Sequence, residues 1–429
     1  MDGLVYPDRT VHTGLLEYKN VYRPVRVVSY DKESGELVLH NYMDFDDLKD
    51  YVKISYELTQ DGLVISKGIL SEFSVASHGE GKTNLKISVP ENGKCYLKLI
   101  YYLKKEMPLL EENHILGFDE IEVSQKDAKC QLAEKWLEKT ATDSELQVNE
   151  DDTQIHIKGR EFAYTIDRRT ALFTEMKFAG REYLNHPMEL NIWRAPTDND
   201  MYIKAEWKKA HYDKAYTRAY TTEVVQGKHG VKIVSHASVV AETVQKILDV
   251  TITWKIDASG KIDADIEATK DGEFPDLPRF GVRMFLDKKL ADIRYFGMGP
   301  QESYRDKHQA ASHGLYRANV GDLHEDYIRP QENGSHYDCE YVELNNSRYG
   351  IVASAEKAFS FNASYYTQEE LEKKTHNYEL IESDSVVFCV DYALNGIGSN
   401  SCGPVVLEQY RFDDVLFRFQ FTLVPYVKG

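Results

Sequence analysis

The chain has 429 residues, and its 70 Asp and Glu exceed its 52 Lys and Arg, which gives a formal net charge of −18. Such an acidic chain argues against nucleic acid and against an anionic membrane surface as partners, because both would repel it. The hydrophobic content of 42% allows a large core, and the length suggests two to four domains at roughly 100–200 residues each.

The five cysteines lie far apart and include no Cys-x-x-Cys pair, which argues against a zinc ribbon or a dithiol redox site. Free thiols in a reducing cytoplasm fit this pattern best. No apolar run approaches the ~20 residues of a membrane-spanning helix, and the first residues do not have the pattern of a signal peptide. We therefore expect a cytoplasmic location.

In chain order, residues 1–19 show no alternation of apolar and polar side chains. From about residue 20 to residue 128, short alternating runs recur roughly every 10–15 residues between Asp-Gly, Ser-Gly and Asn-Gly turn signals. This pattern is typical of an antiparallel sandwich of about seven strands and about 100 residues.

Residues 129–149 are polar and rich in charge, which indicates a linker. Strand-like runs then continue over residues 150–429, which predicts one large β-sandwich rather than α/β units. Two short helices are expected, one over Lys204–His211 and one over Thr367–His376. In the second, Thr367 and Glu370 have the spacing of a capping box.

The familiar catalytic signatures are missing or incomplete. Adjacent carboxylates occur by chance among 70 acids, and no His-Glu-x-x-His motif is present. The two Gly-x-Gly runs, at Gly297 and Gly396, lack the third glycine of a dinucleotide site. Cys402 as a nucleophile would need a partner base, and no histidine lies near it in the sequence. We interpret these features as structural.

Three stretches are richer in Arg, Trp, Asp and Glu than a plain loop requires: residues 191–200, 295–311 and 329–344. Together with two further motifs they resemble the C-terminal part of a glycoside hydrolase family 2 β-galactosidase. The resemblance extends over essentially the whole chain, and the occurrence of five motifs in the family's order makes it highly specific. The five matched motifs are Arg194–Asp200 (RAPTDND), Tyr295–Tyr304 (YFGMGPQESY), Pro330–Gly334 (PQENG), Phe361–Tyr366 (FNASYY) and Gly396–Gly398 (GIG).

This resemblance implies an all-β fold, with an immunoglobulin/fibronectin-like sandwich followed by a large antiparallel β-supersandwich of the galactose mutarotase-like kind. Residues 1–19 would be the C-terminal tail of a TIM-barrel domain that this chain lacks. Residues 20–128 would be the immunoglobulin-like sandwich, 129–149 the linker and 150–429 the large sandwich.

The resemblance also places the catalytic machinery elsewhere. The family's two catalytic glutamates lie on the barrel, so we expect no catalytic residue in this chain and no activity from the chain alone. Magnesium and sodium are expected for the complete enzyme, with no cofactor bound by this chain by itself. The implied partners are the N-terminal domains or a large subunit of the same β-galactosidase and a galactoside substrate, and the family also allows a homo-oligomer.

Several residues of this chain match positions near the family's substrate. Asp2, directly before Gly-Leu-Val, holds the position that touches galactose and a bound sodium ion. Cys402 stands where many relatives place a tryptophan that stacks on the second sugar, and Ser399 and Asn400 lie beside it in the same loop. A thiol would give a softer and smaller apolar wall than an indole ring.

The RAPTDND motif leads, in the family, to a mobile loop at the mouth of the active site, here residues 201–206. We expect Arg194, Asp198, Asn199 and Asp200 to support the base of this loop through bonds between side chains and backbone. We favour this bracing role over direct contact with the ligand.

Three alternatives remain open at this point. The chain fits a natural small subunit of a two-chain β-galactosidase, a stand-alone carbohydrate-binding β-sandwich, or a purely structural assembly domain. Family 2 also cleaves glucuronides and mannosides, but the large sandwich with RAPTDND is typical of its β-galactosidase branch.

Overall fold

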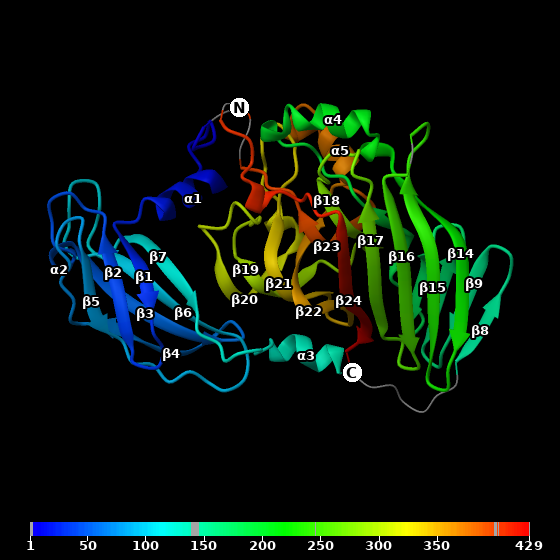
Figure 1. Cartoon of the computed structure of the whole chain (residues 1–429), viewed down its shortest axis with the longest axis horizontal. Coiled ribbons are helices and arrows are strands. Elements are labelled where there is room, and N and C mark those ends of the chain that lie inside the picture. Colours follow the sequence, from blue (N-terminus) through cyan, green and yellow to red (C-terminus); the bar gives the residue numbers. More distant parts are fainter. Residues whose placement is uncertain (1–2, 139–145, 245, 399–400, 402, 429) are drawn as a thin grey trace. The chain divides into compact units, whose positions relative to one another are not determined.

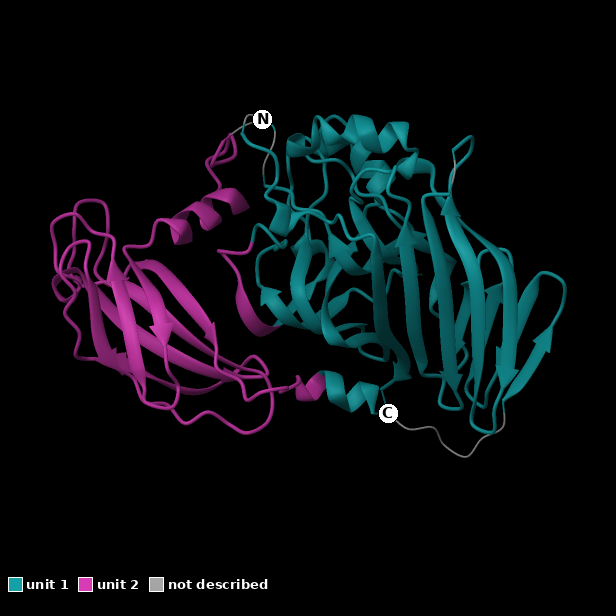
Figure 2. Ribbon diagram, viewed as in Figure 1, with its two compact units in different colours: residues 1, 133–307, 316–429 teal, residues 2–132, 308–315 magenta. Residues whose placement is uncertain are grey.

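The computed structural model describes residues 3–138, 146–244, 246–398, 401 and 403–428 (Figure 1). The chain divides into two compact units, which are described separately (Figure 2). Unit 1 contains residues 133–307 and 316–429, and unit 2 contains residues 2–132 and 308–315. Both units are built mainly from antiparallel strands, so the all-β prediction is confirmed.

Unit 2 is a sandwich of a three-stranded and a four-stranded sheet that share one buried cluster. The buried cluster follows from the alternation of side chains along each strand. In β2 (Glu36–Asn41) and β6 (Cys95–Leu103), every second side chain, such as Leu37, Leu39, Leu97 and Leu99, is fully buried. The elements of unit 2 are α1 (Thr13–Val21), β1 (Val25–Tyr30), β2 (Glu36–Asn41), α2 (Leu48–Tyr51), β3 (Val52–Gln60), β4 (Leu63–Leu70), β5 (Glu80–Asn84), β6 (Cys95–Leu103) and β7 (Ile115–Glu122).

A segment from much later in the chain, residues 308–315, completes unit 2. The carboxylate of Glu17 on α1 accepts hydrogen bonds from the backbone N–H groups of Gln309 and Ala310, both at 2.8 Å. His313 stacks on Tyr96 with ring centroids 4.1 Å apart, and both its backbone N–H and its Nδ1 hydrogen-bond to Glu120. The segment is therefore an integral part of this unit.

Unit 1 packs a five-stranded sheet against a twelve-stranded sheet. The fully buried Trp254 illustrates the interface, because its ring lies 4.9 Å from Phe173 of the smaller sheet and 6.5 Å from Phe421 of the larger one. Its indole N–H donates to the Ala171 carbonyl at 2.8 Å, so the buried polar atom is satisfied.

The smaller sheet contains β8 (Gln147–Glu150), β9 (Gln154–Lys158), β10 (Phe162–Asp167), β11 (Leu172–Phe178) and β12 (Arg181–Glu182). The larger sheet contains β13 (Leu184–Asn191), β14 (Tyr216–Gln226), β15 (Gly230–Val240), β16 (Leu248–Asp257), β17 (Ile262–Lys270), β18 (Arg279–Asp287), β19 (Asp292–Gly299), β20 (Ser312–Asn319), β21 (Ser335–Asn345), β22 (Tyr349–Ser364), β23 (Ser385–Leu394) and β24 (Leu416–Val427).

The short helices of the segment from residue 131 onward are α3 (Gln131–Leu137), η1 (Asp198–Asp200), α4 (Ile203–Lys209), η2 (Tyr212–Lys214), η3 (Val320–Leu323), α5 (Gln368–Lys373), η4 (Asn377–Glu379) and η5 (Glu408–Tyr410). The two predicted short helices correspond to α4 and α5, and the others were not predicted. Thr367 caps α5 by accepting from the Glu370 N–H at 3.1 Å, as predicted. The Glu370 carboxylate accepts instead from the Ile381 N–H, so the reciprocal half of the predicted capping box does not form.

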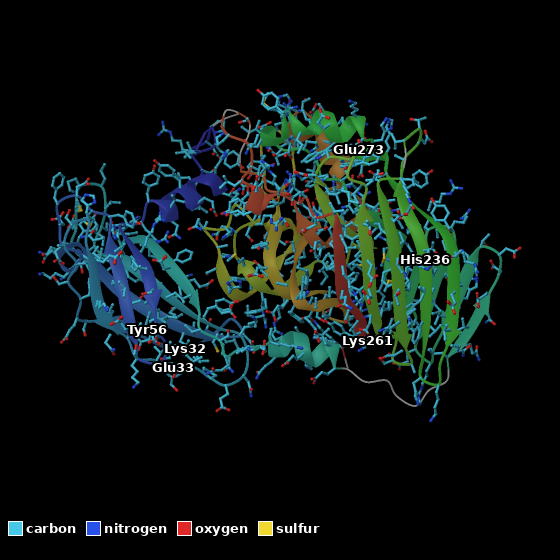
Figure 3. The ribbon with its side chains drawn as sticks, viewed as in Figure 1. Lys32, Glu33, Tyr56, His236, Lys261 and Glu273 are labelled. Atoms are coloured by element: carbon cyan, nitrogen blue, oxygen red, sulfur yellow. The ribbon has the colours of Figure 1, made fainter. Side chains whose placement is uncertain are left out.

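The predicted linker, residues 129–149, contains α3 and the start of β8, while its residues 139–145 lie outside the described part. Trp136 of α3 packs on Tyr426, with ring centroids 5.5 Å apart. Lys261, labelled in Figure 3, donates from Nζ to the Leu137 carbonyl at 2.9 Å. The helical part of this segment is thus anchored to unit 1.

The four described cysteines, Cys95, Cys130, Cys339 and Cys389, are buried free thiols, as expected. Burial raises the pKa of the Cys389 thiol to about 12, which keeps it protonated and unreactive at neutral pH. Across the described residues, no helix has the length and hydropathy needed to cross a membrane.

Candidate active-site rim

The backbone at residues 395–398, at the base of the GIG loop, is held through its carbonyl groups by two side chains of the RAPTDND motif. Arg194 donates from Nη1 to the Asn395 carbonyl at 2.5 Å and from Nη2 to the Gly396 carbonyl at 3.1 Å. Asn199 donates from Nδ2 to the Ile397 carbonyl at 2.7 Å. Three consecutive carbonyl groups of the loop base are therefore fixed.

The N–H groups of the same segment are held from another part of the chain. Asp306 accepts from the Ile397 N–H at 3.1 Å and from the Gly398 N–H at 2.8 Å. The Gly396 N–H donates to the Tyr410 carbonyl at 2.8 Å. A side-chain carbon at Gly396 would lie 2.7 Å from the Asp306 carboxylate, so a larger residue there would displace the group that accepts from Ile397 and Gly398.

Arg194 itself is fully buried and is neutralised by Asp200. The two groups form a fork, with Nη2 to Oδ1 at 2.7 Å and Nε to Oδ2 at 3.1 Å. Asp200 Oδ2 also accepts from the Thr197 N–H at 2.9 Å, which closes the short helix η1. Only arginine combines this fork with further N–H groups that reach two carbonyl oxygens.

These contacts show where the predicted loop-support residues act. Arg194 and Asn199 bond to the loop at 395–398, Asp200 bonds to Arg194, and the Asp198 N–H donates to Gln331 Oε1 at 3.0 Å. Residues 203–206, part of the predicted mobile loop, form the first turn of α4. The support that the structure displays is thus directed at the GIG loop.

The other matched motifs join the same network. The Glu332 N–H donates to the Ala195 carbonyl at 3.0 Å, and the Gly334 N–H donates to Glu302 Oε2 at 2.8 Å. Asn362 donates from Nδ2 to the Asn333 carbonyl at 2.6 Å. All five motifs that carry the family resemblance, more than 200 residues apart at the extremes, therefore meet in one place in unit 1.

A second buried arginine, Arg279, joins this network through Glu332. Arg279 forms a fork with Asp391, at 2.6 and 3.1 Å, and its Nη1 lies 3.3 Å from Glu332 Oε2. The two buried arginines, Arg194 and Arg279, thus face three buried carboxylates, so one acid is in excess.

Glu332 is that acid. Burial raises its pKa, and the opposing attraction of Arg279 and Arg194 does not cancel the effect. Its Oε1 is buried without a hydrogen-bond partner among the described residues, so the protein offers this oxygen no donor that would favour the ionised form.

Glu302 is buried to the same degree, but its environment has the opposite effect. Burial alone would raise its pKa, yet Lys307 at 2.5 Å, the Tyr327 hydroxyl at 2.6 Å and the Gly334 N–H together lower it. Glu302 is therefore an ionised anchor for the strand that follows Gly334.

Comparison with known proteins agrees with this convergence of motifs. A family model described as "Beta galactosidase small chain" matches residues 158–423, which is more than half of the chain. The chain belongs to the β-galactosidase small-chain family. A second model, described as "Beta-galactosidase, domain 4", matches residues 37–124.

Relatives of this chain include a β-galactosidase of Actinobacillus pleuropneumoniae, 43% identical over 426 residues, and one of Staphylococcus xylosus, 31% identical over 426 residues. Each alignment covers 99% of this chain but only 41% or 42% of the relative. The chain therefore spans about two fifths of the length of these relatives. Among solved structures, a galactose 1-epimerase from Lactobacillus acidophilus NCFM matches 68% of the chain and 100% of its own length, with 10% identity and a TM-score of 0.36.

The predicted substrate-binding residues Asp2, Ser399, Asn400 and Cys402 lie outside the described residues. Their contacts with galactose, with the second sugar and with sodium remain predictions. Among the residues that the structure describes, no group of three or more His, Cys, Asp or Glu side chains is arranged to hold a metal ion.

Sequence reasoning missed three residues of the network: Asp306, Arg279 and Asp391. Asp306 lies within the unusual stretch 295–311, so the sequence indicated this segment, but it did not indicate the contact with Ile397 and Gly398. Arg279 and Asp391 are 112 positions apart on two strands whose side chains are buried on both faces along most of their length, and nothing in either segment alone indicates the pair.

Replacement of Arg194 by Gln tests the loop base. We expect Arg194→Gln to lower the free energy of unfolding by about 3–5 kcal/mol, because it leaves Asp200 as an unpaired buried charge. Urea unfolding followed by tryptophan fluorescence measures this change. The matched control is Arg169→Gln, since Arg169 forms a fork with Asp167 but its side chain is 76% exposed, and it should change stability by about 0–1 kcal/mol. Equal losses in the two variants would contradict a special role for the buried pair.

The excess buried acid predicts a pH dependence. Because folding raises the pKa of Glu332 above its ordinary value of 4.5, its contribution is present at low pH and is lost as pH rises from there through the folded pKa. The variant Glu332→Gln should lack this loss, which amounts to at most about 1.4 kcal/mol per pH unit.

Urea unfolding between pH 4.5 and 8 measures the effect. As pH rises, the free energy of unfolding of Glu332→Gln should increase relative to that of the unchanged chain. Glu302→Gln is the control, because the pKa of Glu302 is lowered and its contribution is lost only as pH falls below 4.5, so the difference between this variant and the unchanged chain should stay nearly constant over the same range. Parallel pH curves for the unchanged chain and Glu332→Gln would refute the assignment.

Proposed function

We propose that this chain is the C-terminal part of a retaining β-galactosidase that hydrolyses terminal β-D-galactosides such as lactose. In this proposal the chain is a scaffold and contributes the rim of the active site. Membership of the small-chain family and the names of its relatives support the reaction. The observation that carries the rim assignment is the loop base at residues 395–398, whose backbone is hydrogen-bonded on both sides.

A fixed base suits a loop that contacts a substrate. Ordering a flexible loop on binding costs conformational entropy, and a loop whose stem is already held loses less of it. In this chain Arg194, Asn199 and Asp306 hold the stem from which Ser399, Asn400 and Cys402 follow. We propose that these three following residues face the second sugar of the substrate.

The chemistry itself is assigned to residues outside this chain. A retaining glycosidase needs two carboxyl groups about 5 Å apart, one as nucleophile and one as acid and base. We propose that both lie on the barrel of the complete enzyme, as in the family that the motifs resemble. Glu332 and Glu302 are buried anchors, and no role in bond cleavage is proposed for them.

We further propose that the complete enzyme acts in the cytoplasm and uses magnesium and sodium. Asp2 is the proposed sodium ligand and galactose contact, because a carboxylate is a hard oxygen donor. The partner of the chain is the N-terminal region of the same enzyme, either in one polypeptide or as a large subunit. The description "small chain" of the matching family model supports including the two-chain arrangement.

The purified chain alone should not hydrolyse nitrophenyl-β-galactoside, because it lacks the proposed catalytic pair. Combined with the N-terminal region of a related β-galactosidase, it should support turnover that the N-terminal region alone lacks. Chromogenic assays of the three samples measure this. Turnover by the chain alone would refute the proposal, and saturable binding of lactose to the chain alone, by calorimetry, would favour the stand-alone carbohydrate-binding sandwich.

The variant Cys402→Trp tests the contact with the second sugar. In the complete enzyme we expect it to tighten binding of glucose as acceptor roughly 2- to 10-fold, because an indole ring adds about 0.5–1.5 kcal/mol of stacking. Transglycosylation rates at varied glucose concentration give the affinity. Cys402→Ser keeps the size without the apolar wall and should bind glucose no more tightly than the unchanged enzyme. An unchanged affinity in Cys402→Trp would count against the assignment.

A further inference from the structure

A polar groove of about 580 Å³ lies over β19, β20 and β21 in unit 1. In the antiparallel register Arg294 pairs with Glu343, and Asp292 pairs with Asn345, so these four side chains stand on the same face of the sheet. None of the lining residues belongs to the network around Arg194. They are Asp292, Ile293, Arg294, Arg317, Ala318, Asn319, Asp322, Glu343, Asn345 and Lys428.

The cations of this groove have unused hydrogen-bonding capacity. Arg294 has a buried Nε without a hydrogen-bond partner. Within the described residues, neither Arg294 nor Arg317 forms an ion pair with a carboxylate. Among the residues that the structure describes, Lys428 donates from Nζ to two neutral oxygens, those of the Asn345 side chain at 2.7 Å and the Asn346 carbonyl at 2.8 Å. A group of cations without carboxylate partners is unusual in a chain with 18 more acids than bases.

The acids of the groove, by contrast, already accept hydrogen bonds from the protein. Glu343 accepts from the Tyr341 hydroxyl at 2.5 Å and also from the Tyr426 hydroxyl. Burial, as the largest cause, raises the pKa of both phenols, so they remain protonated donors at neutral pH. Although Glu343 lies directly across from Arg294, each of its oxygens is therefore held by a phenol.

The two aspartates are engaged as well. Asp322 accepts from the Asn319 N–H at 3.0 Å and so completes the capping box of the helix η3. Asp292 accepts from Asn319 Nδ2 at 3.5 Å. The carboxylates of the groove therefore accept from protein donors, whereas its two guanidinium groups have no carboxylate partner in the described part of the chain.

We propose that this groove binds a small oxyanion, a phosphate or a carboxylate group, between Arg294, Arg317 and Lys428. The planar fork of a guanidinium group matches two oxygens of either anion, and two forks on adjacent strands can hold one anion from two sides. The volume lies within the range of about 300–1,000 Å³ of small-molecule sites, so it admits an organic phosphate or a polycarboxylate. Asn319 and Asn345 offer amide groups to the neutral part of such a ligand.

Calorimetric titration of the full chain tests this site, with inorganic phosphate, glucose 6-phosphate and citrate as probes at constant ionic strength set by chloride. We expect saturable binding of at least one probe. Tighter binding of glucose 6-phosphate than of phosphate would indicate an organic phosphate, and tighter binding of citrate a polycarboxylate. Both results support the site.

Arg317→Gln and Arg294→Gln should each weaken binding about 10-fold or more, because each removes a charge-assisted hydrogen bond. Arg317 is exposed, so its variant keeps the test valid if Arg294→Gln folds poorly. Arg348→Gln is the matched control, since Arg348 is an exposed arginine near Lys428 that does not line the groove. No saturable binding of any probe up to about 20 mM, or equal weakening in Arg348→Gln, would overturn the proposal.

Discussion

The local structure of the rim depends on one constraint: the guanidinium group of Arg194 has no exposed surface, so its N–H groups need acceptors within the protein. Arg194 meets it with two carboxylate oxygens and two backbone carbonyl oxygens from a segment about 200 positions later in the chain. The carbonyl groups of a turn cannot bond to one another, so an outside donor is needed to hold them. One side chain thus connects the RAPTDND motif, the helix η1 and the loop base at residues 395–398.

Around Arg194, the number of buried carboxylates relative to buried arginines matters as well as their geometry. Arg194 and Arg279 each form a fork with one aspartate, and burial raises the pKa of the remaining acid, Glu332. Glu302, equally buried, is ionised because a lysine, a phenol and a backbone N–H all point at it. Burial alone therefore does not decide the state of a carboxyl group in this chain, and the balance of nearby donors does.

The parts of this structure that follow from local pattern were predictable, and the parts that follow from distant pairing were not. Alternation in runs such as residues 230–240 predicts strands, and Thr367 predicts the start of α5. That five motifs meet was implied by their resemblance to one family, because no local rule brings Ala195 to Glu332. The pairing of Arg279 with Asp391 and the contacts of Glu343 depend on strand order and register, which the sequence of one strand alone does not contain. The bonds from Ile397 and Gly398 to Asp306 join two segments outside the strands, and no local rule brings these segments together.

The chain enters unit 2 twice, first over residues 2–132 and again over residues 308–315. During synthesis the ribosome must therefore add 315 − 132 = 183 residues before the last segment of that unit exists. At roughly 5–20 residues per second this takes about 9–37 s, during which Glu17, Tyr96 and Glu120 lack the contacts that Gln309, Ala310 and His313 later supply. The order of translation thus sets a minimum time for completing unit 2, and this time does not depend on how fast the sandwich itself folds.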